Sequence, residues 1–306
     1  MDWTVYWFML PVCVVVASVA MFSGISGAAM LTPVFLIGFP LLGVPRLTTV
    51  EAIGTSLLLE TSGFGTGVAR YLAMRLADLQ TARSIIAVTL PLGALGAIAA
   101  RHTPASALRI GYGVAMVGLA WLLARKPPGR PAAEEAPQPA LVSQSDRSHL
   151  PCGHGQPRQI RAAGGRTWAW CAHGLRLQHV LSGVGAFVAG LISTGVGEAT
   201  LPPLVRRSRF PVAVAAATST LIVAGTVVGA AATHLVQLVA AGGLAAIPWN
   251  LLVWAVPGAV TGAMLGTRLQ GRGREDVARR FFAGLFLLIG LTFLLAFTVF
   301  ASRFAR

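Results

Sequence analysis

The chain has 306 residues, of which 55% are hydrophobic and only 11% are charged, and its mean hydropathy is +0.71. A soluble domain of this length would need far more charge to cover its surface, so the composition excludes an ordinary soluble globular protein. The net charge of +14 does not indicate a nucleic-acid partner, because the basic residues lie in short segments between apolar runs and form no basic stripe.

Apolar segments suited to crossing a bilayer recur along the chain. In the first half they lie near 5–23, 28–44, 49–73, 84–100 and 106–124. In the second half they lie near 180–194, 198–205, 211–240, 246–267 and 281–300. The N-terminal stretch MDWTVYWFML carries Asp2 and no basic region, so we interpret it as part of the first segment and not as a signal peptide. The sequence therefore predicts an all-α, polytopic membrane protein with about 8–10 membrane segments, located in the cell (inner) membrane.

Residues 125–178 interrupt the apolar pattern. The stretch KPPGRPAAEEAPQPA within them cannot bury enough apolar surface to fold by itself. We predict a flexible cytoplasmic linker here, between a first transmembrane repeat at 1–124 and a second at 179–306. The cysteines Cys13, Cys152 and Cys171 do not predict a disulfide framework.

Three short motifs occur in both halves, in the same order. Gly27–Pro33 (GAAMLTP) corresponds to Gly197–Pro203 (GEATLPP), Ala52–Ser56 (AIGTS) to Ala215–Ser219 (AAATS), and Pro91–Ala97 (PLGALGA) to Pro257–Ala263 (PGAVTGA). Any one match is weak among apolar segments, but three in the same order indicate an internal repeat.

The distribution of basic residues predicts the topology. If every segment crosses the membrane, including the short ones near 28–44 and 198–205, most of the basic residues fall on the side that holds the linker. If the short segments only dip in and return, the basic residues divide almost evenly. The positive-inside rule favours the first arrangement, with the linker in the cytoplasm and both termini outside. Five crossings per half make the two repeats inverted, as in many secondary transporters.

At these motifs the sequence resembles the TauE/SafE family of membrane transporters, also described as sulfite exporters. The resemblance lies in Ser23-Gly24-Ile25-Ser26-Gly27, Leu31-Thr32-Pro33, Gly54-Thr55-Ser56 and the loop from Tyr71 to Asp78. It implies a secondary transporter that moves a small anion such as sulfite, a sulfonate or another organic anion by alternating access. It implies no enzymatic activity and no cofactor, and it leaves the direction of transport and homo-oligomerisation open.

Two groups of small residues are candidates for binding the solute. Glycine lets the backbone open locally, and a helix that starts there can present free N–H groups to an anion; the candidates are Gly24, Gly27, Gly195 and Gly197. Hydroxyl groups at equivalent positions of the two repeats could also bind an anion; the candidates are Thr55, Ser56, Thr218 and Ser219. Close helix packing and local backbone hydrogen bonds are the competing explanations.

Charged residues within the apolar segments are candidates for coupling transport to an ion gradient. Glu60 lies deep in the third segment and Glu198 lies in the second-half hinge, so we interpret both as candidate proton-coupling groups. Arg70 could hold an anion with its guanidinium, pair with Glu60, or extend to the membrane surface. We interpret His234, which aligns with Tyr71, as a packing or hydrogen-bonding residue.

Two other functions stay open. The tetrapeptide Gly24-Ile25-Ser26-Gly27 resembles the nucleophile turn of an intramembrane serine protease, with His234 as its base. The pairs Cys152-Gly153-His154 and Cys171-Ala172-His173 could bind a metal, which would suit metal handling or metal-ion transport. Their one-residue spacing departs from usual zinc motifs, so we predict no metal site. No P-loop sequence occurs in the chain, which favours an ion gradient as the driving force.

Overall fold

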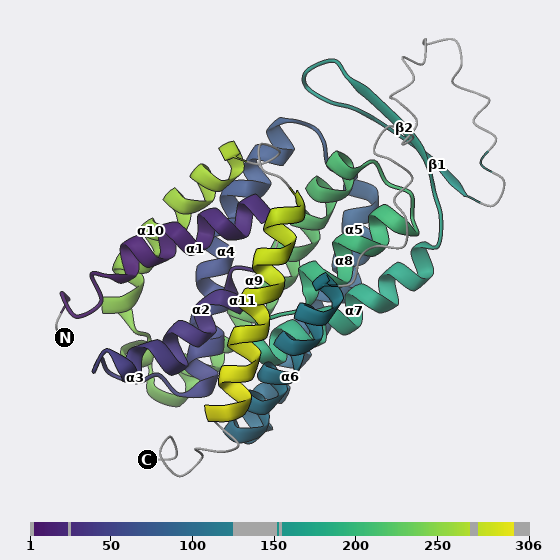
Figure 1. Cartoon of the computed structure of the whole chain (residues 1–306). Coiled ribbons are helices and arrows are strands. Elements are labelled where there is room, and N and C mark those ends of the chain that lie inside the picture. The colour runs from purple at the N-terminus through teal and green to yellow at the C-terminus, as the bar shows by residue number, and fades with distance from the viewer. Residues whose placement is uncertain (1–2, 24–25, 125–151, 153–154, 270–274, 297–306) are drawn as a thin grey trace.

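The computed structural model describes residues 3–23, 26–124, 152, 155–269 and 275–296. The first half contains α1 (Met9–Ser23), α2 (Ala28–Pro33), a π-helical turn (Val34–Gly38), α3 (Phe39–Leu41), α4 (Thr49–Ala73), α5 (Leu79–His102) and α6 (Ala105–Ala124). The second half contains α7 (Leu175–Ile192), α8 (Val196–Arg206), α9 (Val212–Gly242), a short 3₁₀ turn (Leu244–Ala246), α10 (Trp249–Leu269) and α11 (Glu275–Leu294). The predicted all-helical architecture is confirmed for both halves of the chain (Figure 1).

Five helices of the described residues are long and apolar enough to cross a bilayer, and they are α5, α6, α7, α9 and α10. Helices α1 and α11 and the segment from Ala28 to Leu41 are apolar but shorter. Helix α4 has the length but carries Glu51, Glu60 and several hydroxyl residues. It packs against α1, α2, α6, α9 and α10. A helix that is surrounded by other helices does not need a fully apolar surface.

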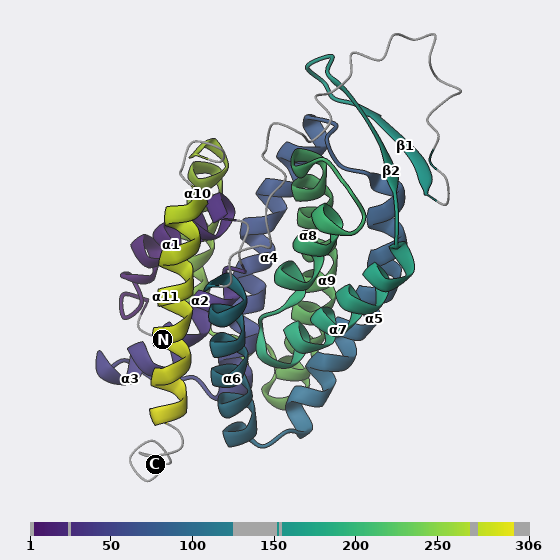
Figure 2. The same cartoon turned by 45° about the vertical axis from the view of Figure 1, so that its right-hand side comes forward.

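The helix neighbours form a pattern of matching pairs (Figures 1 and 2). Helix α4 packs against α9, and α6 packs against α11. Helix α1, the first of its half, contacts α10, and α7, the first helix of the second half, contacts α5. In the same way α4 contacts α10, and α9 contacts α5. The short helix α2 contacts α1 and α4, while the short helix α8 contacts α7 and α9.

Glycines allow the closest of these contacts. Gly258, Gly262 and Gly266 repeat every four residues on α10, and a Cβ on any of them would lie within 2.5 Å of a backbone carbonyl oxygen of α1. On α7, a Cβ at Gly190 would lie 2.0 Å from the carbonyl oxygen of Gly93 in α5. Backbones can approach this closely in a membrane only where side chains are absent.

Long-range contacts define two ends of the bundle. At one end, which we call the far end, the Tyr6 hydroxyl donates to the Pro45 carbonyl (3.4 Å) and Arg109 Nε donates to Thr49 Oγ1 (2.9 Å). At the other, the hairpin end, the Ala163 amide donates to the Met74 carbonyl (3.0 Å) and Trp170 packs on Phe210. The start of α1 and the loop after α3 therefore lie at the far end, so the segment 28–41 returns to the end where α1 begins.

The linker region contains an antiparallel β-hairpin, which the sequence analysis did not predict. Strands β1 (Gln156–Arg161) and β2 (Thr167–Ala172) pair in register from Gln156 with Ala172 to Arg161 with Thr167. Cys152 and Cys171 form a disulfide, which the sequence analysis did not predict. The prediction of a flexible linker fails over 156–172, where the hairpin forms. Trp168 and Trp170 lie on one face of β2 and pack in an apolar cluster with Leu204 and Phe210 of the second half.

Candidate functional site

Two carboxylates converge on the start of α2. The Gly27 amide donates to Glu60 Oε1 (2.9 Å), and the neighbouring Ser26 amide donates to Glu198 Oε1 (3.4 Å). Glu60 comes from α4 and Glu198 from the first turn of α8. The chain breaks before α2 at Gly27 and before α8 at Gly195, and these two breaks bring one acid from each half of the chain to adjacent amides. We call the place where Ser26, Gly27, Glu60 and Glu198 meet the hinge.

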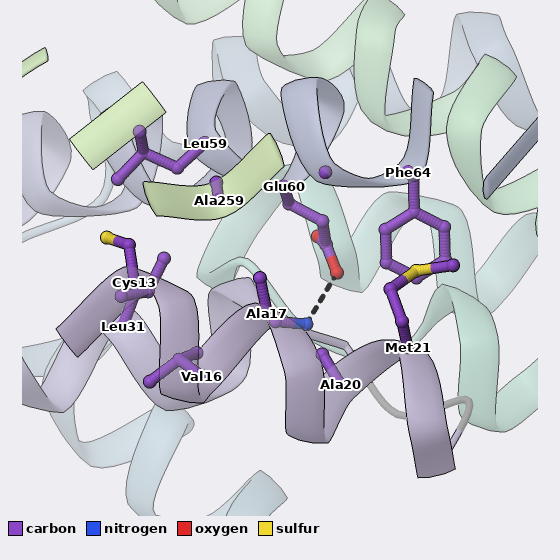
Figure 3. A pocket seen from close by; sticks show the side chains of 12 residues that line it. Cys13, Val16, Ala17, Ala20, Met21, Leu31, Leu59, Glu60, Phe64 and Ala259 are labelled. Carbon is purple, nitrogen blue, oxygen red and sulfur yellow. Dashed lines mark hydrogen bonds between the residues drawn. The ribbon is translucent and has the colours of Figure 1, made fainter. Parts of the chain in front are cut away.

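The cavity beside Glu60 has an almost entirely apolar wall. The Glu60 side chain is 4% exposed and borders this cavity of about 20 Å³ between α1, α2, α4 and α10, with Ala17, Ala20, Leu59 and Phe64 in its wall (Figure 3). That volume holds roughly one water molecule. The Glu198 Oε2 atom is buried without a hydrogen-bond partner. Among the described residues, neither carboxylate forms an ion pair with a basic side chain.

A chain of hydroxyl groups lies next to the acids and joins the halves. Thr32 Oγ1 lies 2.9 Å from Ser56 Oγ and 2.7 Å from Ser193 Oγ. Ser26 Oγ donates to the Ser193 carbonyl (3.5 Å). Ser193 ends α7 with a φ of 60°, and this left-handed conformation turns its carbonyl and hydroxyl toward α2. All four residues are buried.

Pro33 explains the irregular path of the α2 segment. Proline has no N–H, so the Ala29 carbonyl four residues earlier loses its helical partner. The Tyr112 hydroxyl of α6 donates to that carbonyl instead. The helix then continues through the π-helical turn Val34–Gly38, which is typical of functional sites in membrane helices.

The structure brings most of the predicted site residues together. Gly27, Ser56, Glu60 and Glu198 lie at the hinge, as described above. Gly195 precedes α8 with a φ of 123°, a conformation that favours glycine, and Gly197 is buried in its first turn. Gly24 lies outside the described residues.

Other predicted residues lie away from the hinge. Thr55 borders a separate cavity at the far end, and Thr218 accepts a hydrogen bond from the Asp78 amide (3.0 Å) near the hairpin end. Ser219 is buried on α9. Arg70 is exposed and donates to Thr267 Oγ1 of α10 (2.9 Å). The hypothesis that Arg70 pairs with Glu60 is therefore wrong in this structure.

Sequence reasoning missed Thr32, Tyr112, Ser193 and Thr194. Thr194 Oγ1 is buried beside the hinge without a partner. Ser193 corresponds to Ser23 when the repeat motifs are extended by four residues toward the N-terminus. That extension could have pointed to it. Tyr112 has no motif, because its role depends on the tertiary contact with α2.

The protease and metal hypotheses gain no support from the geometry. Ser26 Oγ bonds to the Ser193 carbonyl and the Ala29 amide, while His234 Nε2 bonds to the Gly190 carbonyl (2.9 Å). Ser26 and His234 therefore do not form a nucleophile–base pair. In this structure Cys152 and Cys171 are joined in a disulfide, and His154 lies outside the described residues. The residues that the structure describes hold no cluster of three or more potential metal ligands.

Comparison with known proteins agrees with this architecture. The family model described as "Sulfite exporter TauE/SafE" matches residues 9–293. No curated protein and no solved structure matches the chain. The matched range spans both halves, the hinge acids and the hairpin, and this chain belongs to the TauE/SafE family of membrane transporters.

Proposed function

We propose that this chain is a proton-coupled secondary transporter of a small anion, such as sulfite, a sulfonate or another organic anion. The observation that carries the proposal is the convergence of Glu60 and Glu198, one from each half, on the adjacent amides of Gly27 and Ser26. In a membrane protein, buried acids without a basic partner are typical of proton pathways.

The geometry supports a mechanism in which the substrate anion takes the place of the Glu60 carboxylate at the Gly27 amide. Two ionised carboxylates at adjacent amides would repel each other strongly in apolar surroundings. One proton held between them removes the repulsion, and protonation of Glu60 also weakens its hold on the Gly27 amide. An oxyanion can then accept the released N–H, with the hydroxyls of Thr32, Ser56 and Ser193 close by. Binding of the anion and binding of the proton are thereby linked.

Alternating access requires two halves that move against each other, and we propose that they are inverted repeats. The matching helix neighbours, α1 on α10 and α7 on α5, support this proposal. So do Thr55 and Thr218, which are equivalent in the repeat motifs but lie near opposite ends of the bundle. The first repeat would comprise 1–124, the second 179–306, and both repeats contribute to the hinge.

We place the hairpin end in the cytoplasm. The exposed basic residues Arg75, Arg83, Arg206, Arg207 and Arg209 lie in the loops and helix ends at this end, close to the hairpin. An excess of arginine on one side of a membrane protein favours the cytoplasmic side.

The test is a flux assay with purified protein in lipid vesicles. The panel contains sulfite, methanesulfonate, acetate and, as a cation, Zn²⁺, each with and without a pH gradient. We expect uptake of at least one anion to be accelerated by a pH gradient and to fall back to the rate without a gradient when the gradient is collapsed. Transport of the cation alone would overturn the proposed substrate class and favour metal-ion transport.

A further inference from the structure

The β-hairpin of the linker is docked on the second half of the chain by apolar contacts. It lies at the hairpin end of the bundle, beside the start of α5 (Figures 1 and 2). The Trp170 ring is 6% exposed and packs on Phe210, with the ring centroids 5.0 Å apart. Trp170 belongs to an apolar cluster that also holds Leu204 of α8 and Ala82 of α5. A short connection from β2 into α7 ties the hairpin further to the second half.

Hydrogen bonds hold the same hairpin to the first half. At its tip, the Ala163 amide donates to the carbonyl of Met74, the residue that ends α4 (3.0 Å). On β1, Arg158 donates to Gln80 Oε1 at the start of α5, and its Nε lies 3.9 Å from Asp78 Oδ2. The hairpin therefore bridges the loop between α4 and α5 in the first half and the loop after α8 in the second.

The two ends of the bundle differ in this conformation. At the far end, Thr55 borders a cavity of about 230 Å³, and the exposed residues Thr48 and Arg101 lie in the wall of that cavity. At the hairpin end, the equivalent residue Thr218 is fully buried and accepts a hydrogen bond from the Asp78 amide (3.0 Å). The loop that covers Thr218 is the loop that the hairpin holds.

The docked hairpin leaves several hydrogen-bond donors without partners. Among the described residues, the ring nitrogens Nε1 of Trp168 and Trp170 and the Nε of Arg158 are buried and donate to no acceptor. All three carry an N–H group, and each N–H would find water if the hairpin lifted. Burying a donor without a partner costs free energy. This cost offsets part of the gain from burying the two rings, so the docked position can be given up.

We propose that the hairpin, residues 156–172, is a latch that holds the hairpin end closed and releases the loop between α4 and α5 before the hinge opens to that side. The inference rests on the proposed transport function and adds the element that controls one of the two openings. Water can replace the hydrogen bonds to the first half at low cost. The apolar contact with Phe210 keeps the hairpin on the second half while the halves move apart.

The first experiment measures how often the hairpin lifts. Ala82→Cys supplies a reporter thiol, because Ala82 is 1% exposed and belongs to the apolar cluster that holds Trp170. The full-length protein is purified without reductant, so that the Cys152–Cys171 disulfide stays intact, while Cys13 is buried. A charged thiol reagent then labels position 82 only when the hairpin detaches from α5.

Ala163→Pro weakens the contact with the first half and preserves the hairpin. The Gly165 amide donates to the Ala162 carbonyl (3.0 Å), which makes Ala163 the second residue of a β-turn, a position that proline favours. Proline removes the N–H that the Met74 carbonyl accepts. The rate of labelling at position 82 should rise by about twofold to tenfold, which corresponds to the loss of one hydrogen bond. Ala163→Ser keeps the N–H and should label like the protein that carries the reporter alone.

Arg158→Gln removes the other contact and should also accelerate labelling by about twofold to tenfold. Arg161→Gln is its matched control, because it makes the same change on the same strand at an exposed position, and it should leave the rate unchanged. Unchanged labelling in both Ala163→Pro and Arg158→Gln would overturn the latch and leave the transport proposal intact.

The second experiment locks the hairpin in place. Met74→Cys and Ala163→Cys are combined, since both residues are exposed and their backbones are hydrogen-bonded, and a short bifunctional thiol reagent joins them. The cross-linked protein should lose anion flux in vesicles, while each single variant treated with the reagent should keep it. Full flux in the cross-linked protein would overturn the latch. Faster labelling in Ala163→Pro, in a protein that moves no anion, would support a movable hairpin and contradict the transport proposal.

Discussion

The hydroxyl of Thr32 lies 2.7 Å from the hydroxyl of Ser193, and this contact joins the two halves of the transporter beside the acidic hinge. Thr32 Oγ1 also lies 2.9 Å from Ser56 Oγ. The hinge in this conformation is therefore held by side chains that belong to α2, α4 and the end of α7.

Replacing Thr32 with valine removes both contacts while it preserves the shape of the side chain. We predict that Thr32→Val lowers the free energy of unfolding by about 1–3 kcal/mol, because two buried hydroxyls lose a partner. Thermal unfolding of the purified protein measures this. Thr61→Val is the control, since Thr61 bonds only to the Leu57 carbonyl of its own helix (2.9 Å). Equal losses in the two variants would show that the contact between the halves contributes nothing.

Gly190 tests whether α5 and α7 pack as closely as described. A Cβ there would lie 2.0 Å from the Gly93 carbonyl oxygen and 2.8 Å from the Ala97 nitrogen. We predict that Gly190→Ala destabilises the protein by about 3 kcal/mol or more, since overpacking against backbone cannot be relieved by a rotamer change. Gly111→Ala on α6 meets no atom within 4 Å and should be neutral or slightly stabilising. Comparable yields and melting temperatures for both variants would contradict the close contact.

Tyr112 and Pro33 should show coupled effects on stability. Tyr112→Phe leaves the Ala29 carbonyl without a donor and should cost about 1–3 kcal/mol. In a Pro33→Ala background the new N–H at position 33 can bond to Ala29, so the same change should cost much less. A double-mutant cycle by thermal unfolding measures the difference. Additive effects would show that the tyrosine does not replace the bond that proline removes.

The Cys152–Cys171 disulfide tests the orientation of the protein. Disulfides are rare in the cytosol, so a cytoplasmic hairpin should hold both thiols reduced in cells and form the bond only after purification without a reductant. A membrane-impermeant thiol reagent should then label them only after the cells are permeabilised. Cys13 is buried in α1 and should not react. An intact disulfide in unbroken cells would place the hairpin outside and reverse our orientation.

The membrane class and both hinges could be predicted because they depend on local signals. Apolar runs predict helices, and the duplicated motifs around Gly27 and Gly197 mark where those helices break. Glu60 and Glu198 could be selected because an acid in an apolar segment is conspicuous in the sequence alone.

The partners of these residues could not be predicted, because they come from contacts distant in sequence. Arg70 and Glu60 lie on the same helix, which suggested a pair, but Arg70 extends to Thr267 of α10. The equivalence of Thr55 and Thr218 suggested one shared site, yet the two residues have different neighbours. The hairpin was missed because Trp168 and Trp170 are embedded in a polar, proline-rich region. Their partners come later in the chain, Leu204 within α8 and Phe210 in the loop after it.

The most direct test of the central claim is a simultaneous measurement of anion and proton flux for Glu60→Gln in lipid vesicles. Glu51→Gln is the matched control, because it makes the same change on the same helix but in the exposed cap. We predict that the unmodified protein and Glu51→Gln move protons together with the anion. Glu60→Gln should still exchange anions across the membrane but carry no protons with them. Proton movement that continues with the anion in Glu60→Gln would contradict the role of Glu60 in coupling.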